Sequence, residues 1–168
     1  QLTCGSTWHA AGLVSQFHGY PCVTNLASYG IELMQELEAE TGQATGFKAV
    51  GAIGVALNAA RREALLRRKD IAIGQGIEVR SLSLGELEEK WPLLNTQGVL
   101  EAIYFPNDGR TNPIDTTMAL AKGARAAGAT IIENTEVLNL IVQQGRVRGV
   151  ETEKGTIHAD NVVNCTGL

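Results

Sequence analysis

The residue types best suited to chemistry lie close together near the start of the chain, in the segment Gly5-Ser6-Thr7-Trp8-His9-Ala10-Ala11-Gly12. Hydroxyl groups and backbone amides here could hold phosphate oxygens, while Trp8 offers an aromatic face and His9 a nucleophilic ring nitrogen. A simpler interpretation is that Ser6 or Thr7 caps a short helix and that His9 is a solvated loop histidine. Residue types alone leave both interpretations open.

The order of the residues adds a resemblance to a known family. The stretch LTCGSTWHAAGL, residues 2–13, resembles the flavin-attachment segment of the dimethylglycine and sarcosine dehydrogenases, within the larger group of FAD enzymes similar to D-amino-acid oxidase. In that family the histidine of the segment is joined through a ring nitrogen to the 8α-methyl group of FAD. The resemblance therefore implies that His9 holds FAD covalently. It implies FAD contacts for the following residues: Gly5, Ser6, Thr7, Trp8, His9, Ala10, Ala11, Gly12 and Leu13.

The resemblance covers nearly the whole chain and implies two further FAD contacts. In such enzymes a valine just after the strand that follows the long helix meets the adenine through its backbone, and Val137 is the matching position. Residues 162–167 are similar to the family's late FAD motif, an apolar strand that ends in Ala-Thr-Gly. Cys165, Thr166 and Gly167 are therefore expected beside the dinucleotide, with Cys165 as a small buried thiol in place of the usual alanine.

Two parts of such enzymes are expected outside this chain. No GxGxxG sequence occurs, so the glycine-rich strand, turn and helix that bind the FAD pyrophosphate should precede Gln1. The family's active-site histidine and tyrosine, and any folate-binding region, should follow Leu168. Because the last residues come directly after an apolar strand pattern, we expect an internal fragment that is inactive alone and contains no catalytic residue of its own.

The resemblance implies an enzyme that oxidatively demethylates an N-methyl amino acid, dimethylglycine or sarcosine, by hydride transfer to FAD. Tetrahydrofolate is a possible second cofactor of the intact protein, and the electron acceptor is not indicated. A related substrate, such as a proline-like or D-amino acid, would keep the same fold. An alternative of another class is a non-catalytic folded fragment, or an oligomerising interaction module, that does not bind FAD by itself.

Composition and charge exclude several other function classes. The chain of 168 residues has a net charge of −4 and a pI near 5.4, which disfavours nucleic acid or anionic lipid as a partner. No apolar run reaches the roughly 20 residues that a membrane-spanning helix needs. Three widely spaced cysteines without a CxxC pair indicate neither a disulfide framework nor a metal site. They favour a reducing compartment, the bacterial cytoplasm or the mitochondrial matrix.

The elements that must position these residues alternate between helix and strand. The spacing of Leu26, Tyr29, Leu33 and Leu37 predicts an amphipathic helix that ends at Gly42. Capping patterns predict two more helix starts, at Ser83 and at Asn112-Pro113. The predicted helices cover residues 25–41, 59–69, 83–89 and 113–127. The predicted strands cover residues 47–57, 77–82, 99–105, 130–133, 136–143, 146–153 and 156–165.

Together with the resemblance, these elements predict an α/β fold. It is part of a Rossmann-like FAD-binding domain of the glutathione-reductase type that lacks its N-terminal βαβ unit and carries an inserted α+β lobe of a substrate domain. We expect three segments: residues 1–45 with the FAD-attachment loop and helix, residues 46–108 with the inserted lobe, and residues 109–168 with a helix, a β-meander and the final strand.

The remaining polar candidates have mainly structural interpretations. His18 could line a cofactor cleft but more simply belongs to a loop, and His158 is expected to be exposed on a strand. Capping and salt bridges at a helix start explain Asp108, Arg110 and Asp115. A solvated helix face, or less simply a partner-binding patch, explains the basic group: Arg61, Arg62, Arg67, Arg68 and Lys69.

Overall fold

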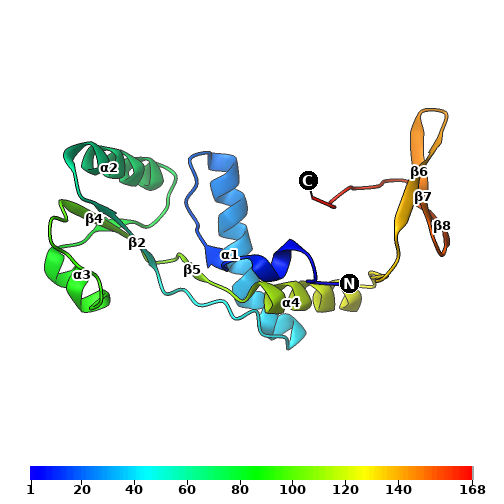
Figure 1. Ribbon diagram of the computed structural model, residues 1–168, viewed down its shortest axis with the longest axis horizontal. Helices are drawn as coiled ribbons and strands as arrows, with labels where there is room; N and C mark the ends of the chain where they lie inside the picture. Colours follow the sequence, from blue (N-terminus) through cyan, green and yellow to red (C-terminus); the bar gives the residue numbers. More distant parts are fainter. Residues whose placement is uncertain (168) are drawn as a thin grey trace. The chain divides into compact units, whose positions relative to one another are not determined.

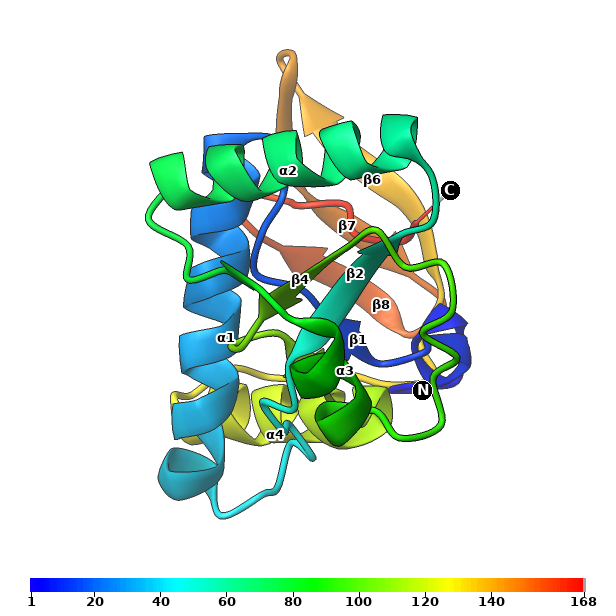
Figure 2. The same ribbon diagram turned by 90° about the vertical axis from the view of Figure 1, so that its left-hand side faces the viewer.

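The computed structural model describes residues 1–167, which form two compact units (Figures 1 and 2). Residues 2–129 make up the first unit, and residues 130–167 together with Gln1 make up the second. Helices and antiparallel sheets alternate along the chain, as the predicted α/β fold requires. Among the described residues, no helix combines the length and the apolar character needed to cross a membrane.

The first unit contains an antiparallel sheet with the strand order β2-β4-β3. β2 (Ala52–Ala56) pairs along its whole length with β4 (Glu101–Phe105), and β3 (Arg80–Ser81) pairs with the other edge of β4. Each strand is shorter than the range predicted for it. Apolar runs predict where a strand lies, but the strand itself extends only as far as its ladder with a neighbour.

Helices cover both faces of this sheet (Figure 1). On one face α2 (Ala59–Gly74) packs Leu65 and Ala72 into a core with Ile103 and Phe105 of β4. On the other face α3 (Leu84–Lys90) buries Leu87 in a second core that includes Ala102 of β4. Successive side chains of β4 therefore enter opposite cores, as the twofold period of a strand requires.

A capping box starts α3, as the sequence predicts. The Ser83 side chain accepts a hydrogen bond from the Glu86 backbone N–H, and the Glu86 carboxylate accepts from the Ser83 backbone N–H at 2.9 Å. These bonds hold the pKa of Glu86 at about 2, below its ordinary value of 4.5, with the Ser83 backbone as the largest cause and Arg80 as the next. The capping pattern seen in the sequence therefore also lowers the pKa of the carboxyl group at the start of α3.

The lowered pKa of Glu86 predicts a pH dependence of stability. Its contribution is fully present above pH 4.5 and is lost as pH falls toward about 2, because the folded state must then release these bonds. The urea midpoint should fall more steeply over this interval in the wild type than in Glu86→Gln. Glu89→Gln, on the same helix and without a partner in the described chain, should follow the wild type. Parallel curves for wild type and Glu86→Gln would contradict the prediction.

The long helix α1 (Pro21–Thr41) begins earlier than predicted, because Pro21 takes the first helical position. It ends at Gly42, as predicted. Only part of the predicted apolar face is buried: Leu37 is 4% exposed, whereas Leu26 is 70% and Tyr29 60% exposed. The physical reason is that α1 packs mainly against α4, near its C-terminal end.

The helix α4 (Pro113–Ala126) agrees closely with its prediction. The Asn112 side chain accepts hydrogen bonds from the backbone N–H groups of Ile114 and Asp115, at 3.0 and 3.3 Å. Asp115 lies in the first turn, where a carboxylate interacts favourably with the helix dipole. The start of α4 is thus fixed by local sequence alone.

The second unit is the predicted antiparallel meander, with the order β6-β7-β8. β6 (Val137–Gln143), β7 (Arg146–Thr152) and β8 (Gly155–His158) are joined by tight turns. Residues 130–133 and 159–165 form no strand, so those two predictions are wrong for the described chain. Both segments have strand-like sequences but no neighbouring strand that completes a ladder with them there. The three-segment division of the chain remains a prediction.

Candidate functional site

The segment around His9 forms a single turn of 3₁₀ helix, η1 (Ser6–His9). Ala10 closes it by donating its backbone N–H to the Thr7 carbonyl at 3.1 Å, and the turn lies against α4. Gly5 precedes the turn, and no side chain caps it. The short helix is therefore present, but the predicted capping by Ser6 or Thr7 is wrong.

The His9 imidazole is exposed and lies against the ring of its neighbour Trp8. The two ring centroids are 4.0 Å apart and the planes are tilted by 35°. Within residues 1–167, neither ring nitrogen of His9 has a hydrogen-bond or ion-pair partner. Trp8 is itself 56% exposed. Both nitrogens of His9 are thus available to a ligand, and an aromatic face stands beside them.

Gly12 fixes the chain three residues after His9. Its carbonyl accepts a hydrogen bond from the Thr111 backbone N–H at 2.8 Å. Its φ of +71° is one that side chains with a Cβ rarely adopt, and a Cβ here would stand 2.2 Å from the Thr111 carbonyl oxygen. Only glycine allows this close approach of two backbone segments.

Asp108 fixes the same segment a few residues further on. Its side chain is buried and accepts hydrogen bonds from the Gln16 backbone N–H at 2.7 Å and from the Ser15 hydroxyl at 3.1 Å. Between these contacts β1 (Leu13–Val14) pairs with β5 (Gly109–Arg110). The predicted capping and salt-bridge role of Asp108 is wrong, because Asn112 caps α4 and Asp108 instead holds the chain behind His9.

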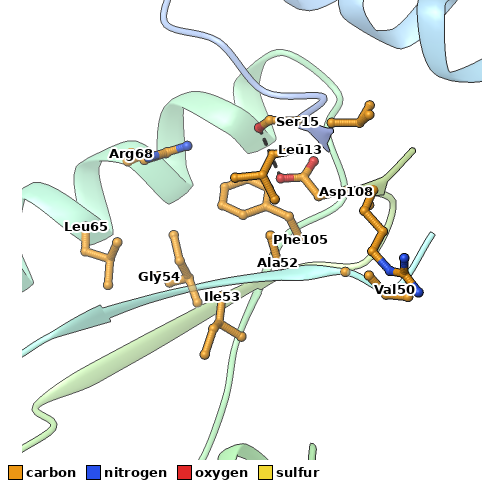
Figure 3. Close-up of a pocket in the computed structure, with 15 residues that line it drawn as sticks. Leu13, Ser15, Val50, Ala52, Ile53, Gly54, Leu65, Arg68, Phe105 and Asp108 are labelled. Carbon is orange, nitrogen blue, oxygen red and sulfur yellow. Dashed lines mark hydrogen bonds between the residues drawn. The ribbon is translucent and has the colours of Figure 1, made fainter. Parts of the chain in front are cut away.

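A cavity of about 300 Å³ lies beside this segment, between β2, α2 and Asp108 (Figure 3). Its walls are mostly apolar, with Leu13, Leu65 and Phe105 among them. Arg68 also lines it, and the guanidinium carbon lies 5.5 Å from the ring centroids of Phe17 and Phe105. Arg68 is exposed, as predicted for a solvated basic face, and its guanidinium also packs against these aromatic rings.

The other predicted FAD contacts lie in the second unit. Val137 is the first residue of β6 and is 55% exposed. Thr166 donates from its backbone and its hydroxyl to the Asn164 side chain, at 3.0 and 2.7 Å, and Gly167 has a positive φ of 87°. The Cys165 thiol is exposed, so the predicted burial of this thiol is wrong: the predicted final strand does not extend past His158 to include Cys165.

The remaining histidines take structural positions. His18 is exposed, and its backbone N–H and carbonyl bond the Thr24 hydroxyl near the start of α1. His158 is exposed on β8, as predicted. Among the described residues, no group of three or more histidine, cysteine or acidic side chains is arranged to hold a metal ion.

Comparison with known families identifies the family of the chain. The family described as DAO, FAD dependent oxidoreductase, matches residues 1–168. The chain belongs to this family. For this chain, the expected fold and the resemblance expected from the His9 segment are thereby confirmed at the level of the DAO family.

Individual DAO-family proteins match over nearly the whole chain. The 4-methylaminobutanoate oxidase (formaldehyde-forming) of Paenarthrobacter nicotinovorans is 40% identical over 99% of this chain and 20% of its own length. Human mitochondrial dimethylglycine dehydrogenase is 36% identical over 100% of this chain and 19% of its own length. The crystal structure of L-proline dehydrogenase from P. horikoshii superposes with a TM-score of 0.89, at 28% identity, over 97% of this chain and 43% of that chain. The chain therefore spans about a fifth of the length of these two curated relatives.

DAO-family membership implies FAD, and the residues of the His9 turn fit such a group. The imidazole is exposed and its nitrogens are unpartnered within the described chain. Around Gly5 there is open space, because a Cβ placed there would meet no atom within 4 Å. The exposed imidazole and the open space at Gly5 are therefore compatible with a planar ring beside the turn.

Proposed function

We propose that the intact protein oxidatively demethylates N-methyl amino acids with FAD attached covalently to His9. The observation that carries this proposal is the exposed imidazole of His9, whose ring nitrogens have no partner among residues 1–167, in a turn that resembles the family's attachment segment. The relatives' names support the substrate class, because two of them act on compounds with N-methyl groups. Residues 5–13, Val137 and Cys165–Gly167 are the proposed FAD contacts.

The role of FAD, when bound, is to accept a hydride from the N-methyl carbon, leaving an iminium that water converts to formaldehyde and the demethylated product. The chain's own part is to hold and orient the ring. A ring nitrogen of His9 would hold the flavin by a bond to its 8α-carbon. Forming that bond would release two protons and two electrons, and the electrons would pass to the enzyme's electron acceptor. The backbone contact of Gly12 and the side-chain contacts of Asp108 would hold the segment next to His9 in place.

The substrate class can be tested on the intact protein in the absence of oxygen. One candidate compound at a time is added, and reduction of the flavin is followed. Sarcosine, dimethylglycine or 4-methylaminobutanoate should bleach the flavin absorbance, and turnover should release one formaldehyde for each methyl group removed. D-alanine and L-proline serve as controls that have no N-methyl group. Bleaching by the controls alone would move the protein to another substrate class of the same family.

A second candidate is a non-catalytic module that pairs with itself. Exposed apolar side chains favour it, among them Leu26 and Tyr29 on α1 and Leu138 and Leu140 on β6. Purification decides between the two candidates. A yellow protein with flavin absorbance supports the oxidoreductase, whereas a colourless oligomer without any flavin supports the module.

A further inference from the structure

A buried carboxylate holds the chain just behind His9. Asp108 is 3% exposed, and within the described residues its side chain has no cationic partner. Its two carboxylate oxygens both accept hydrogen bonds from the same segment: Oδ1 accepts from the Gln16 backbone N–H, and Oδ2 accepts from the Ser15 hydroxyl. Burying a carboxylate costs free energy that only such bonds offset. An apolar residue would avoid that cost but could not hold the segment.

The backbone around Asp108 is itself fixed by hydrogen bonds to a neighbouring segment. The Asp108 carbonyl accepts a hydrogen bond from the Gly51 backbone N–H at 2.7 Å. Two residues later, Arg110 and Lys48 exchange backbone hydrogen bonds in both directions, at 2.8 and 3.1 Å. A Cβ on Gly109 would stand 2.2 Å from the Lys48 carbonyl oxygen, so these two backbone segments lie in close contact. Asp108 therefore acts from a fixed backbone.

The segment that Asp108 holds leads directly to His9. Residues 12–16 are bonded at one end to Thr111, through Gly12, and at the other end to Asp108. Only Ala10 and Ala11 separate Gly12 from His9 and the end of η1. A shift of residues 12–16 along β5 would therefore move the imidazole as well.

We propose that Asp108 is a positioning residue for flavin attachment: its carboxylate sets the register of residues 12–16 on β5 and thereby the place of the His9 imidazole. This inference rests on the proposed attachment of FAD to His9. The two hydrogen bonds carry the effect, and the amide of Asn could reproduce both, since its oxygen accepts from Gln16 and its NH₂ group donates to the Ser15 oxygen.

The test uses the intact protein without flavin, to which FAD is added at a saturating concentration. The rate at which acid-stable flavin forms should fall about tenfold or more in Asp108→Ala, because a misplacement of about 1 Å can cost up to about a hundredfold in rate. Asp108→Asn should stay close to the wild type. Ser15→Ala removes one bond of the two, so it should slow attachment even if Asp108→Ala fails to fold.

Hydrogen exchange gives a second readout that needs no flavin. Backbone amides of residues 9–16 should exchange faster in Asp108→Ala and Ser15→Ala and at the wild-type rate in Asp108→Asn. Leu87→Ala, in the core on the far face of the sheet, is the control for general loss of stability and should leave these amides unchanged relative to the rest of the first unit.

The outcomes separate this inference from the proposed function. Wild-type attachment rates and exchange in both Asp108→Ala and Ser15→Ala would overturn the positioning role. An effect of equal size in Leu87→Ala would overturn it too, because the loss would then reflect stability alone. If the wild type forms no acid-stable flavin, attachment at His9 fails, and the exchange of residues 9–16 by itself decides whether Asp108 sets their register.

Discussion

Replacing His9 with alanine should remove all acid-stable flavin from the intact protein while leaving FAD that can dissociate. The reason is that the proposed covalent bond needs the imidazole nitrogen, whereas the other proposed FAD contacts do not. A histidyl bond also makes the flavin ring more electron-poor, so its loss should slow reduction by substrate about tenfold, or about 1.4 kcal/mol in activation free energy. Absorbance of the acid precipitate and stopped-flow reduction measure the two effects.

His18→Ala is the matched control for this change. His18 is also an exposed histidine of the same loop region, but its contacts are made by the backbone. Covalent flavin should therefore be complete in this variant. Retention of covalent flavin in His9→Ala, or its loss in His18→Ala, would show that the attachment lies elsewhere.

Replacing Gly12 with alanine should cause the largest loss of stability of any change in this segment. The new Cβ would stand 2.2 Å from the Thr111 carbonyl oxygen and 3.3 Å from Pro113 Cδ, at a φ of +71°. Strain of this kind, with the repulsion added, should lower the free energy of unfolding by about 2–4 kcal/mol. Urea unfolding followed by circular dichroism measures it.

Gly30→Ala is the control for a glycine without such a constraint. Gly30 lies inside α1, and a Cβ placed there would meet no atom within 4 Å. Alanine should therefore stabilise the helix, by up to about 1 kcal/mol. If the two substitutions had equal effects, the close contact between Gly12 and Thr111 would not be a determinant of the fold.

The elements that the sequence predicts well are those with local causes. The start of α3 at Ser83 and the start of α4 at Asn112 follow from side chains that bond amides two or three residues away. The meander follows from alternating residues and tight turns. Residues 130–133 have an equally strand-like composition, but a strand forms only with a neighbour, which local sequence does not supply.

The residues of the candidate site also fall into two groups. Some are indicated by the local sequence, and others are placed by contacts between segments far apart in the chain. The order of residues 5–13 is enough to propose His9 as the attachment residue, because the segment that carries the resemblance is contiguous in sequence. The role of Asp108 could not be predicted, since its partners Ser15 and Gln16 are 93 and 92 residues away. The pair Asp108-Gly109 indicates a turn in the sequence, but a turn signal says nothing about which distant segment the carboxylate will bind.

The most direct test of attachment at His9 is the mass of one peptide. The intact protein is precipitated in acid, washed free of loose cofactor and digested, and the peptide containing His9 is measured. We expect its mass to be raised by one FAD, less the two hydrogens lost on bond formation, with fragment ions that place the addition on His9. An unmodified His9 peptide from a protein that nevertheless carries flavin would contradict attachment at this residue.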